Sequence, residues 1–163
     1  MKALAAALAG CMLSAACDQA ADGLAEERIP AEPGKKLIRL PAKVWEREKC
    51  GTRALPYLRL DHTGIAPKSV KPGGSINYRF TYTACVPKQP GYMLGRFQTE
   101  ISQDGKKLST RTDDNYPVET GKLVVDTHIV VPKDAAPGTY TLAGELSLEG
   151  GTLRDATTFN VTP

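Results

Sequence analysis

The sequence predicts an all-β chain organised as a single antiparallel β-sandwich of seven to eight strands. The 163 residues include 15 Gly and 12 Pro but only 3 Phe, a composition that favours many turns over a helical bundle. From residue 37 onward, short runs that are apolar or alternate with polar residues recur between turn residues, and no convincing amphipathic helix interrupts them. Two half-apolar sheets of this kind bury their faces against each other.

The clearest strand is expected at residues 75–84, "SINYRFTYTA", where apolar and polar residues alternate. Successive side chains of a strand point to opposite sides, so one face collects the apolar residues Ile76, Tyr78, Phe80 and Tyr82. The other strands are expected at residues 37–40, 54–60, 92–102, 107–112, 122–131, 139–148 and 153–161.

Turn chemistry separates these strands. Asp104-Gly105 predicts a tight hairpin turn, because Gly tolerates the positive φ that such turns need, and Gly150-Gly151 predicts a second one. Residues 112–117, "TDDNYP", carry acids but lack the spacing of a calcium-binding EF-hand loop, so we expect a polar turn there.

The segment "VPKDAAPGTYTL", residues 131–142, resembles the connection into the penultimate strand of bacterial immunoglobulin-like and fibronectin-like domains. The resemblance implies an immunoglobulin-like sandwich over residues 37–163, in which Tyr140 closes a corner by bonding to upstream backbone. Leu142 stands where antibody domains have a core cysteine, so the resemblance is to the broad sandwich class. This class hosts many unrelated activities, and it therefore fixes no function.

The N-terminal residues predict export. Lys2 precedes an apolar run of residues 3–16, which is too short to span a bilayer and is typical of a secretory signal peptide. Small residues directly before a cysteine resemble the lipobox of bacterial lipoproteins, in which that cysteine begins the mature chain and carries acyl chains such as palmitate. Cys17 is preferred over Cys11 as the lipidated residue, because Cys11 would leave a signal of only ten residues.

The lipoprotein resemblance implies a lipid-anchored protein of the bacterial cell envelope that faces the periplasm. Asp18 resembles the inner-membrane retention signal of enteric bacteria, which favours the inner membrane but leaves the choice of membrane open. Residues 17–36 are rich in Ala, Glu and Pro and lack aromatics, so we expect a flexible tether between the lipidated end and the domain.

Cys50 and Cys85 are the remaining cysteines. We expect them to form a structural disulfide, because exported chains meet an oxidising compartment. The sequence has no C-x-x-C motif, and no histidine lies near either cysteine, which argues against a redox pair or a metal site.

Catalytic patterns are sparse. The only histidines, His62 and His128, lie close to Asp61 and Asp126, but such pairs on a sandwich surface seldom bind metal or transfer protons. The chain has neither a G-x-S-x-G elbow nor a phosphate-binding glycine loop. We therefore expect a protein that is not an enzyme and has no metal or cofactor. The net charge of +3 is too small to indicate nucleic-acid binding.

Two features point to binding surfaces. The loop "CVPKQPGYM" is a candidate binding loop, with Lys88, Tyr92 and Tyr116 as candidate contacts, and Trp45 is either an exposed binding aromatic or a cap on the core. Residues 35–71 hold ten Lys or Arg against three acids, whereas residues 112–150 hold seven acids against two bases. If these blocks separate in space, the domain is polarised and steers a charged partner, but we expect a mixed, solvated surface, because strands distant in sequence interleave in a sandwich.

These observations favour a non-enzymatic envelope protein whose sandwich binds a protein partner, as a component or accessory of a membrane-associated assembly. The alternative is a binding or inhibitor module that captures a sugar chain or a hydrolase through its loops. A hydrolase or metal-handling enzyme is the least supported class. The sequence indicates neither the identity of the partner nor the oligomeric state.

Overall fold

The computed structural model describes residues 33–88 and 90–163. The predicted signal peptide (1–16), the lipidation at Cys17 or Cys11, and the predicted tether up to residue 32 lie outside the described residues. None of the helices in the described ranges is long and apolar enough to cross a membrane.

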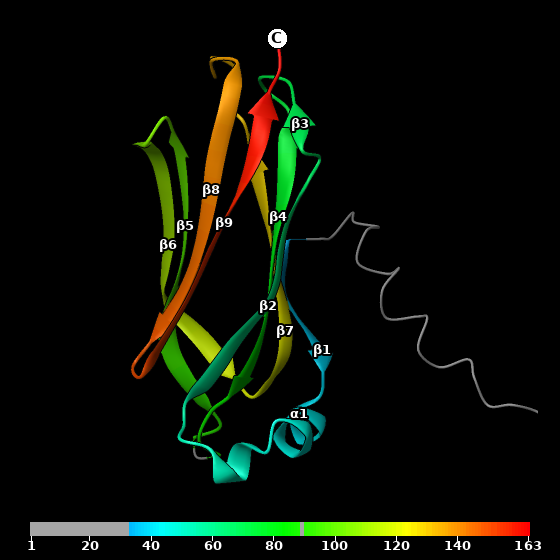
Figure 1. Cartoon of the computed structure of the whole chain (residues 1–163), viewed down its shortest axis with the longest axis vertical. Coiled ribbons are helices and arrows are strands. Elements are labelled where there is room, and N and C mark those ends of the chain that lie inside the picture. The colour runs from blue at the N-terminus through cyan, green and yellow to red at the C-terminus, as the bar shows by residue number, and fades with distance from the viewer. Residues whose placement is uncertain (1–32, 89) are drawn as a thin grey trace, which may run out of the picture.

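The predicted all-β sandwich is confirmed, with two sheets that face each other (Figure 1). Sheet A has the strand order β1-β7-β4-β2, and sheet B has the order β3-β9-β8-β5-β6. All pairings are antiparallel except that of β3 with β9. The strands are β1 (Gly34–Arg39), β2 (Tyr57–Ala66), β3 (Ser69–Val70), β4 (Ser75–Cys85), β5 (Tyr92–Gln103), β6 (Lys106–Glu119), β7 (Gly121–Val130), β8 (Gly138–Leu148) and β9 (Gly151–Val161).

The strand order is immunoglobulin-like. β2, β4 and β7 occupy the positions of strands A, B and E, and β9, β8, β5 and β6 those of G, F, C and C′. β1 comes first in the chain but takes the place beside E that strand D has in antibody domains. Tyr140, near the start of β8, donates its hydroxyl hydrogen bond to the carbonyl oxygen of Ala136 at 2.8 Å, the corner contact that the resemblance implies.

The core lies between the sheets and is built around β4. Its inward residues, which are those expected from the alternation, are all buried: Ile76, Tyr78, Phe80 and Tyr82. The Phe80 ring meets the edge of Phe97 in sheet B with the ring centroids 5.4 Å apart, an arrangement that aromatic pairs favour.

The outward face of β4 is partly covered by polar side chains, and Thr81 and Thr83 on this face are buried. Arg79 binds the Asp126 carboxylate through two hydrogen bonds of 2.8 and 2.9 Å, and Asp126 has no exposed side-chain surface. Thr83 donates to Asp61 at 2.6 Å, and Arg59 bonds the other oxygen of that carboxylate at 2.8 Å. Each buried acid of this face is therefore paired with an arginine, which offsets the cost of removing its charge from water.

Several local expectations need correction. The nine described strands exceed the expected number because β3 has only two residues, which is too short to show an alternating pattern in the sequence. Residues 112–117 belong to β6 and do not form a turn, because they pair with β5 across a bulge between Gly95 and Phe97. The last hairpin turns at Glu149-Gly150, one residue earlier than expected, whereas Asp104-Gly105 turns as predicted with φ values of 50° and 77°.

Two short helices follow β1, in a region where the sequence suggested none. α1 (Pro41–Arg47) and η1 (Cys50–Thr52) lie at the end of the sandwich opposite the C-terminus (Figure 1). Val44 and the Cys50–Cys85 disulfide form a small apolar cluster there, separate from the main core. The disulfide thus joins the helical segment to the end of β4.

Gly144 is required for the two sheets to approach each other at Tyr78. A Cβ at position 144 would lie 2.2 Å from the Tyr78 hydroxyl oxygen, which has no hydrogen-bond partner among the described residues. We expect Gly144→Ala to lower the free energy of unfolding by about 1–3 kcal/mol, as overpacking does. Tyr78→Phe should relieve part of this loss in the double variant. Urea denaturation measures both effects, and additive losses would contradict the assigned contact.

The disulfide closes a segment of 35 residues. Replacing both Cys50 and Cys85 by Ser should lower the free energy of unfolding by about 4 kcal/mol, because the unfolded chain gains loop entropy. Thermal unfolding of the oxidised protein, the reduced protein and the double variant tests this. Equal midpoints for the oxidised protein and the double variant would refute a stabilising role for the bond.

Candidate functional site

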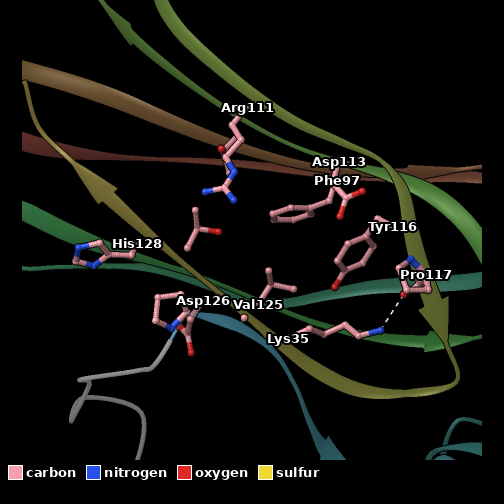
Figure 2. A pocket seen from close by; sticks show the side chains of 13 residues that line it. Lys35, Phe97, Arg111, Asp113, Tyr116, Pro117, Val125, Asp126 and His128 are labelled. Atoms are coloured by element: carbon pink, nitrogen blue, oxygen red, sulfur yellow. Dashed lines mark hydrogen bonds between the residues drawn. The ribbon is translucent and has the colours of Figure 1, made fainter.

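The sandwich is open on the side where β6 and β7 lie. A cleft of about 650 Å³, here called the edge cleft, runs between the sheets and is lined by residues of β1, β5, β6 and β7 (Figure 2). Phe97 and Val125 form its apolar wall. A second hollow of about 330 Å³ is lined by the next residues along the same strands, including Leu108, Ile129 and Val130.

This opening exposes apolar side chains beside an unpaired strand edge. Leu108 is 49% exposed and Val130 is 64% exposed. β6 is the last strand of sheet B, so among the described strands only β5 pairs with it. Residues 106–115 of β6 are exposed throughout. An edge of this kind leaves backbone N–H and C=O groups available to a further strand.

Charged groups lie at both ends of the edge cleft (Figure 2). Lys35 donates to the carbonyl oxygen of Pro117 at 2.9 Å and pairs with Glu119 at 2.9 Å. Arg111 points into the cleft from β6 and makes no hydrogen bond or ion pair with another described residue. The cleft therefore offers Arg111 as an available cation, with the apolar Phe97 and Val125 and the carboxylate of Asp113 also among its lining residues.

The three predicted contact residues have different surroundings in the structure. Tyr116 is 6% exposed, and its hydroxyl lies 3.2 Å from that of Tyr82 in the core, so only its ring reaches the edge cleft. Tyr92 is 48% exposed at the start of β5. Lys88 lies at the α1 end of the molecule, with its ammonium 4.8 Å from the centre of the Trp45 ring.

Trp45 and Lys88 line a third cavity, the end hollow, of about 420 Å³. Pro41, Pro87 and Gly91 complete much of its wall. Trp45 is partly buried and packs against the disulfide cluster, as expected for a cap on this small core, while the role of a binding aromatic stays a prediction.

The two histidines lie apart, and each neighbouring acid has an arginine partner. Asp61 binds Arg59, and Asp126 binds Arg79. His62 lies in β2 on the outer face of sheet A, whereas His128 lies on β7 beside the edge cleft. Within residues 33–88 and 90–163, no group of three or more His, Cys, Asp or Glu side chains is arranged to hold a metal ion.

Sequence reasoning missed Arg111 and Leu108 as site residues. Both belong to a run that reads as an ordinary polar strand, and nothing in the run shows that it forms the edge of the sheet. That position follows from the pairing of β5 with both β6 and β8, a non-local property.

The fold and the site define an immunoglobulin-like sandwich with an open edge at β6. No protein-family model matches the chain, and no curated protein does. Solved structures with similar folds include a Pseudomonas fluorescens alkylpurine DNA glycosylase AlkC bound to DNA, with 13% identity and a TM-score of 0.49 over 65% of this chain. The Bacillus subtilis sporulation control protein Spo0M has 11% identity and a TM-score of 0.44 over 65% of this chain.

A β-glucosidase from Erythrobacter marinus, EmGH1, has 9% identity and a TM-score of 0.48 over 66% of this chain. The chain spans 30% of the glycosylase, 49% of Spo0M and 16% of the glucosidase. Similarity at this level concerns the fold alone, and none of these activities is transferred to the chain.

The buried tyrosine pair predicts a dependence of stability on pH. Burial raises the pKa of Tyr116 to about 12 and raises that of Tyr82 as well. Because unfolded tyrosine ionises near pH 10, the stability from these groups is present below about pH 10 and is lost as the pH rises toward the folded pKa. Each buried tyrosine should contribute a slope of up to about 1.4 kcal/mol per pH unit.

Urea denaturation at a series of alkaline pH values measures this slope. Tyr116→Phe is the control variant, because it removes one ionisable group and keeps the ring, and its slope should be smaller. Tyrosinate absorbance that reaches the value for all six tyrosines before unfolding begins would contradict the buried placement.

Proposed function

We propose that the protein is a non-enzymatic, lipid-anchored protein of the bacterial cell envelope whose sandwich binds a protein partner. The observation that carries the proposal is the open edge of β6 beside the edge cleft. An extended segment of the partner adds to sheet B as a further strand, bonding to the backbone of β6 at residues 106–115. Strand addition of this kind takes its affinity from main-chain hydrogen bonds and its specificity from side-chain pockets.

The chemistry of the cleft specifies the segment. The side chains of the partner's segment that point into the cleft are apolar, because they contact Phe97, Leu108 and Ile129. One inward residue is acidic, because Arg111 has no partner among the described residues and a carboxylate would pair with its guanidinium. The partner is therefore a protein with an extended, apolar and acidic segment.

β6 also limits indiscriminate pairing. Lys106 and Lys107 lie at its exposed start, and bulges in the β5–β6 ladder distort the strand near Gly95 and Ile101. Charged residues and bulges are the usual means by which edge strands avoid aggregation. An edge protected in this way favours a partner with a matching sequence over nonspecific strand addition.

The N-terminal resemblance supports the envelope part of the proposal. A lipid at Cys17 followed by a tether places the domain near a membrane while leaving its edges accessible. The Cys50–Cys85 disulfide is consistent with an oxidising compartment such as the periplasm. These two features concern location, and the edge cleft concerns binding, so each is tested separately.

A photo-crosslinking residue at Thr110 in living cells tests the binding surface. Thr110 lies in the middle of the exposed part of β6, and Thr158, which is also exposed, on β9, is the matched control position. We expect Thr110 to capture a defined envelope protein that Thr158 does not capture. Capture of a second copy of this chain, or equal capture at both positions, would contradict the proposal.

Binding measured with the purified captured protein completes the test. Leu108→Asp should weaken affinity at least tenfold, because it places a charge in the apolar groove next to the new strand. Thr158→Asp adds the same charge elsewhere and should leave the affinity within about twofold. Thermal unfolding verifies that both variants remain folded, which an exposed position predicts for each.

The end hollow favours the alternative, a module that captures a sugar chain or a hydrolase through its loops. Trp45 is the only tryptophan of the chain, so its fluorescence reports directly on this cavity. A saturable change in emission on adding cell-wall glycan fragments would support the alternative. The protein-partner proposal predicts no such change.

A further inference from the structure

The outer face of sheet A is hollowed into a basic surface. This basic hollow has a volume of about 660 Å³ and receives residues from β1, β2, β4, β7 and α1. It contains six Lys or Arg side chains against two carboxylates, those of Asp61 and Asp126. The six cations are Lys36, Arg39, Arg47, Arg59, Arg79 and Lys122.

The two carboxylates are already paired with cations, and Asp61 has Lys122 at 4.0 Å in addition to Arg59. Arg79 binds Asp126, and Arg59 binds both Asp61 and the adjacent Glu48. Hydrogen bonding with Asp61 raises the pKa of Arg59, which keeps it charged. Arg39 and Arg47 make no side-chain hydrogen bond or ion pair with another described residue. The surplus of positive charge therefore lies at the rim.

Two β-bulges shape this hollow from opposite edges of the sheet. One lies between Leu37 and Arg39 in β1, and both Ile38 and Arg39 line the hollow. The other lies between Leu60 and His62 in β2, and both Asp61 and His62 line it. Because regular strands place only alternate residues on one face, each bulge adds one side chain to this face.

The floor of the hollow holds an unsatisfied polar group. The hydroxyl of Thr81 is buried, the residue being 1% exposed, and it has no hydrogen-bond partner among the described residues. Its neighbour on the same face, Thr83, donates to Asp61. A buried hydroxyl without a partner carries a desolvation cost, which a bound acceptor would relieve.

We propose that the basic hollow binds the phosphate group of an anionic phospholipid headgroup. Planar guanidinium groups such as those of Arg39 and Arg47 match the oxygens of a phosphate, and the Thr81 hydroxyl donates a further hydrogen bond to it. The rim favours a lipid as the source of the phosphate, because Ile38 is 53% exposed and Leu40 is 65% exposed beside these cations. Apolar and basic side chains side by side are typical of surfaces that rest on anionic membranes.

This site goes beyond the proposed partner binding and does not depend on it. The basic hollow lies on the outer face of sheet A, whereas the edge of β6 belongs to sheet B. Substitutions in the basic hollow that abolish lipid binding should leave crosslinking from Thr110 intact. Substitutions in β6 that abolish partner binding should leave lipid binding intact.

Co-sedimentation of the full-length chain with phosphatidylcholine vesicles, with and without phosphatidylglycerol, tests the proposal at fixed ionic strength. We expect phosphatidylglycerol to strengthen binding beyond what the acyl chains proposed at Cys17 give with phosphatidylcholine alone, and this added affinity is the quantity compared below. Arg39→Gln/Arg47→Gln should weaken it about thirtyfold, since each basic side chain at an anionic surface contributes about fivefold. The matched control is Arg96→Gln/Arg154→Gln, which removes the same charge from exposed positions of sheet B and should cost less than about threefold. Equal losses in the two pairs would overturn the site in favour of a net-charge effect.

Thr81→Val separates a binding hydroxyl from a structural one. It should weaken vesicle binding about fivefold while leaving the thermal midpoint unchanged or raised, because the hydroxyl has no partner in the ligand-free fold. Unchanged vesicle binding in this variant would overturn the assigned floor of the site. Titration with inorganic phosphate provides the last arm, and saturable phosphate binding without vesicle binding would overturn the lipid as its source.

Discussion

Strand β4 ties the two layers of the fold together, because its inward face is buried in the core and its outward face is held by charge pairs. Its inward aromatic residues fill the space between the sheets, so the register of β4 fixes the main core. Its outward residues must then be covered by side chains that can satisfy Arg79 and Thr83, and Asp126 and Asp61 do so from the neighbouring strands β7 and β2. Packing on one side and charge pairing on the other therefore hold the same strand.

The sequence predicted the inward half of this arrangement and not the outward half. Strict alternation around Phe80 identifies core residues because strand periodicity is local. The pairing of Arg79 with Asp126 joins residues 47 positions apart, and no spacing rule announces it. The Cys50–Cys85 disulfide could also be predicted, because only two cysteines remain after the N-terminal segment. The candidate contact Tyr116 could not be judged from the sequence, because the sequence does not show whether a tyrosine hydroxyl contacts solvent or, as here, the core.

The same architecture leaves different surfaces with different chemistry. Sheet B ends at β6 without a further described strand, which creates a backbone-rich edge beside apolar walls. Long cationic side chains lie on the outer face of sheet A, and they outnumber the acids there. Part of the basic block noted in residues 35–71 gathers in the basic hollow, through four of its ten cations: Lys36, Arg39, Arg47 and Arg59. This cluster of positive charge thus belongs to the outer face of sheet A.

The proposed binding role requires the protein to be in the cell envelope, so its location is tested before its binding surfaces. The intact mass of the protein extracted from membranes with detergent, measured with and without reductant, tests that location most directly. We expect a chain that begins at Cys17, carries acyl chains and gains the mass of two hydrogen atoms on reduction, as the Cys50–Cys85 bond requires. A chain that retains Met1, or a cleaved chain without lipid, would contradict the envelope anchor.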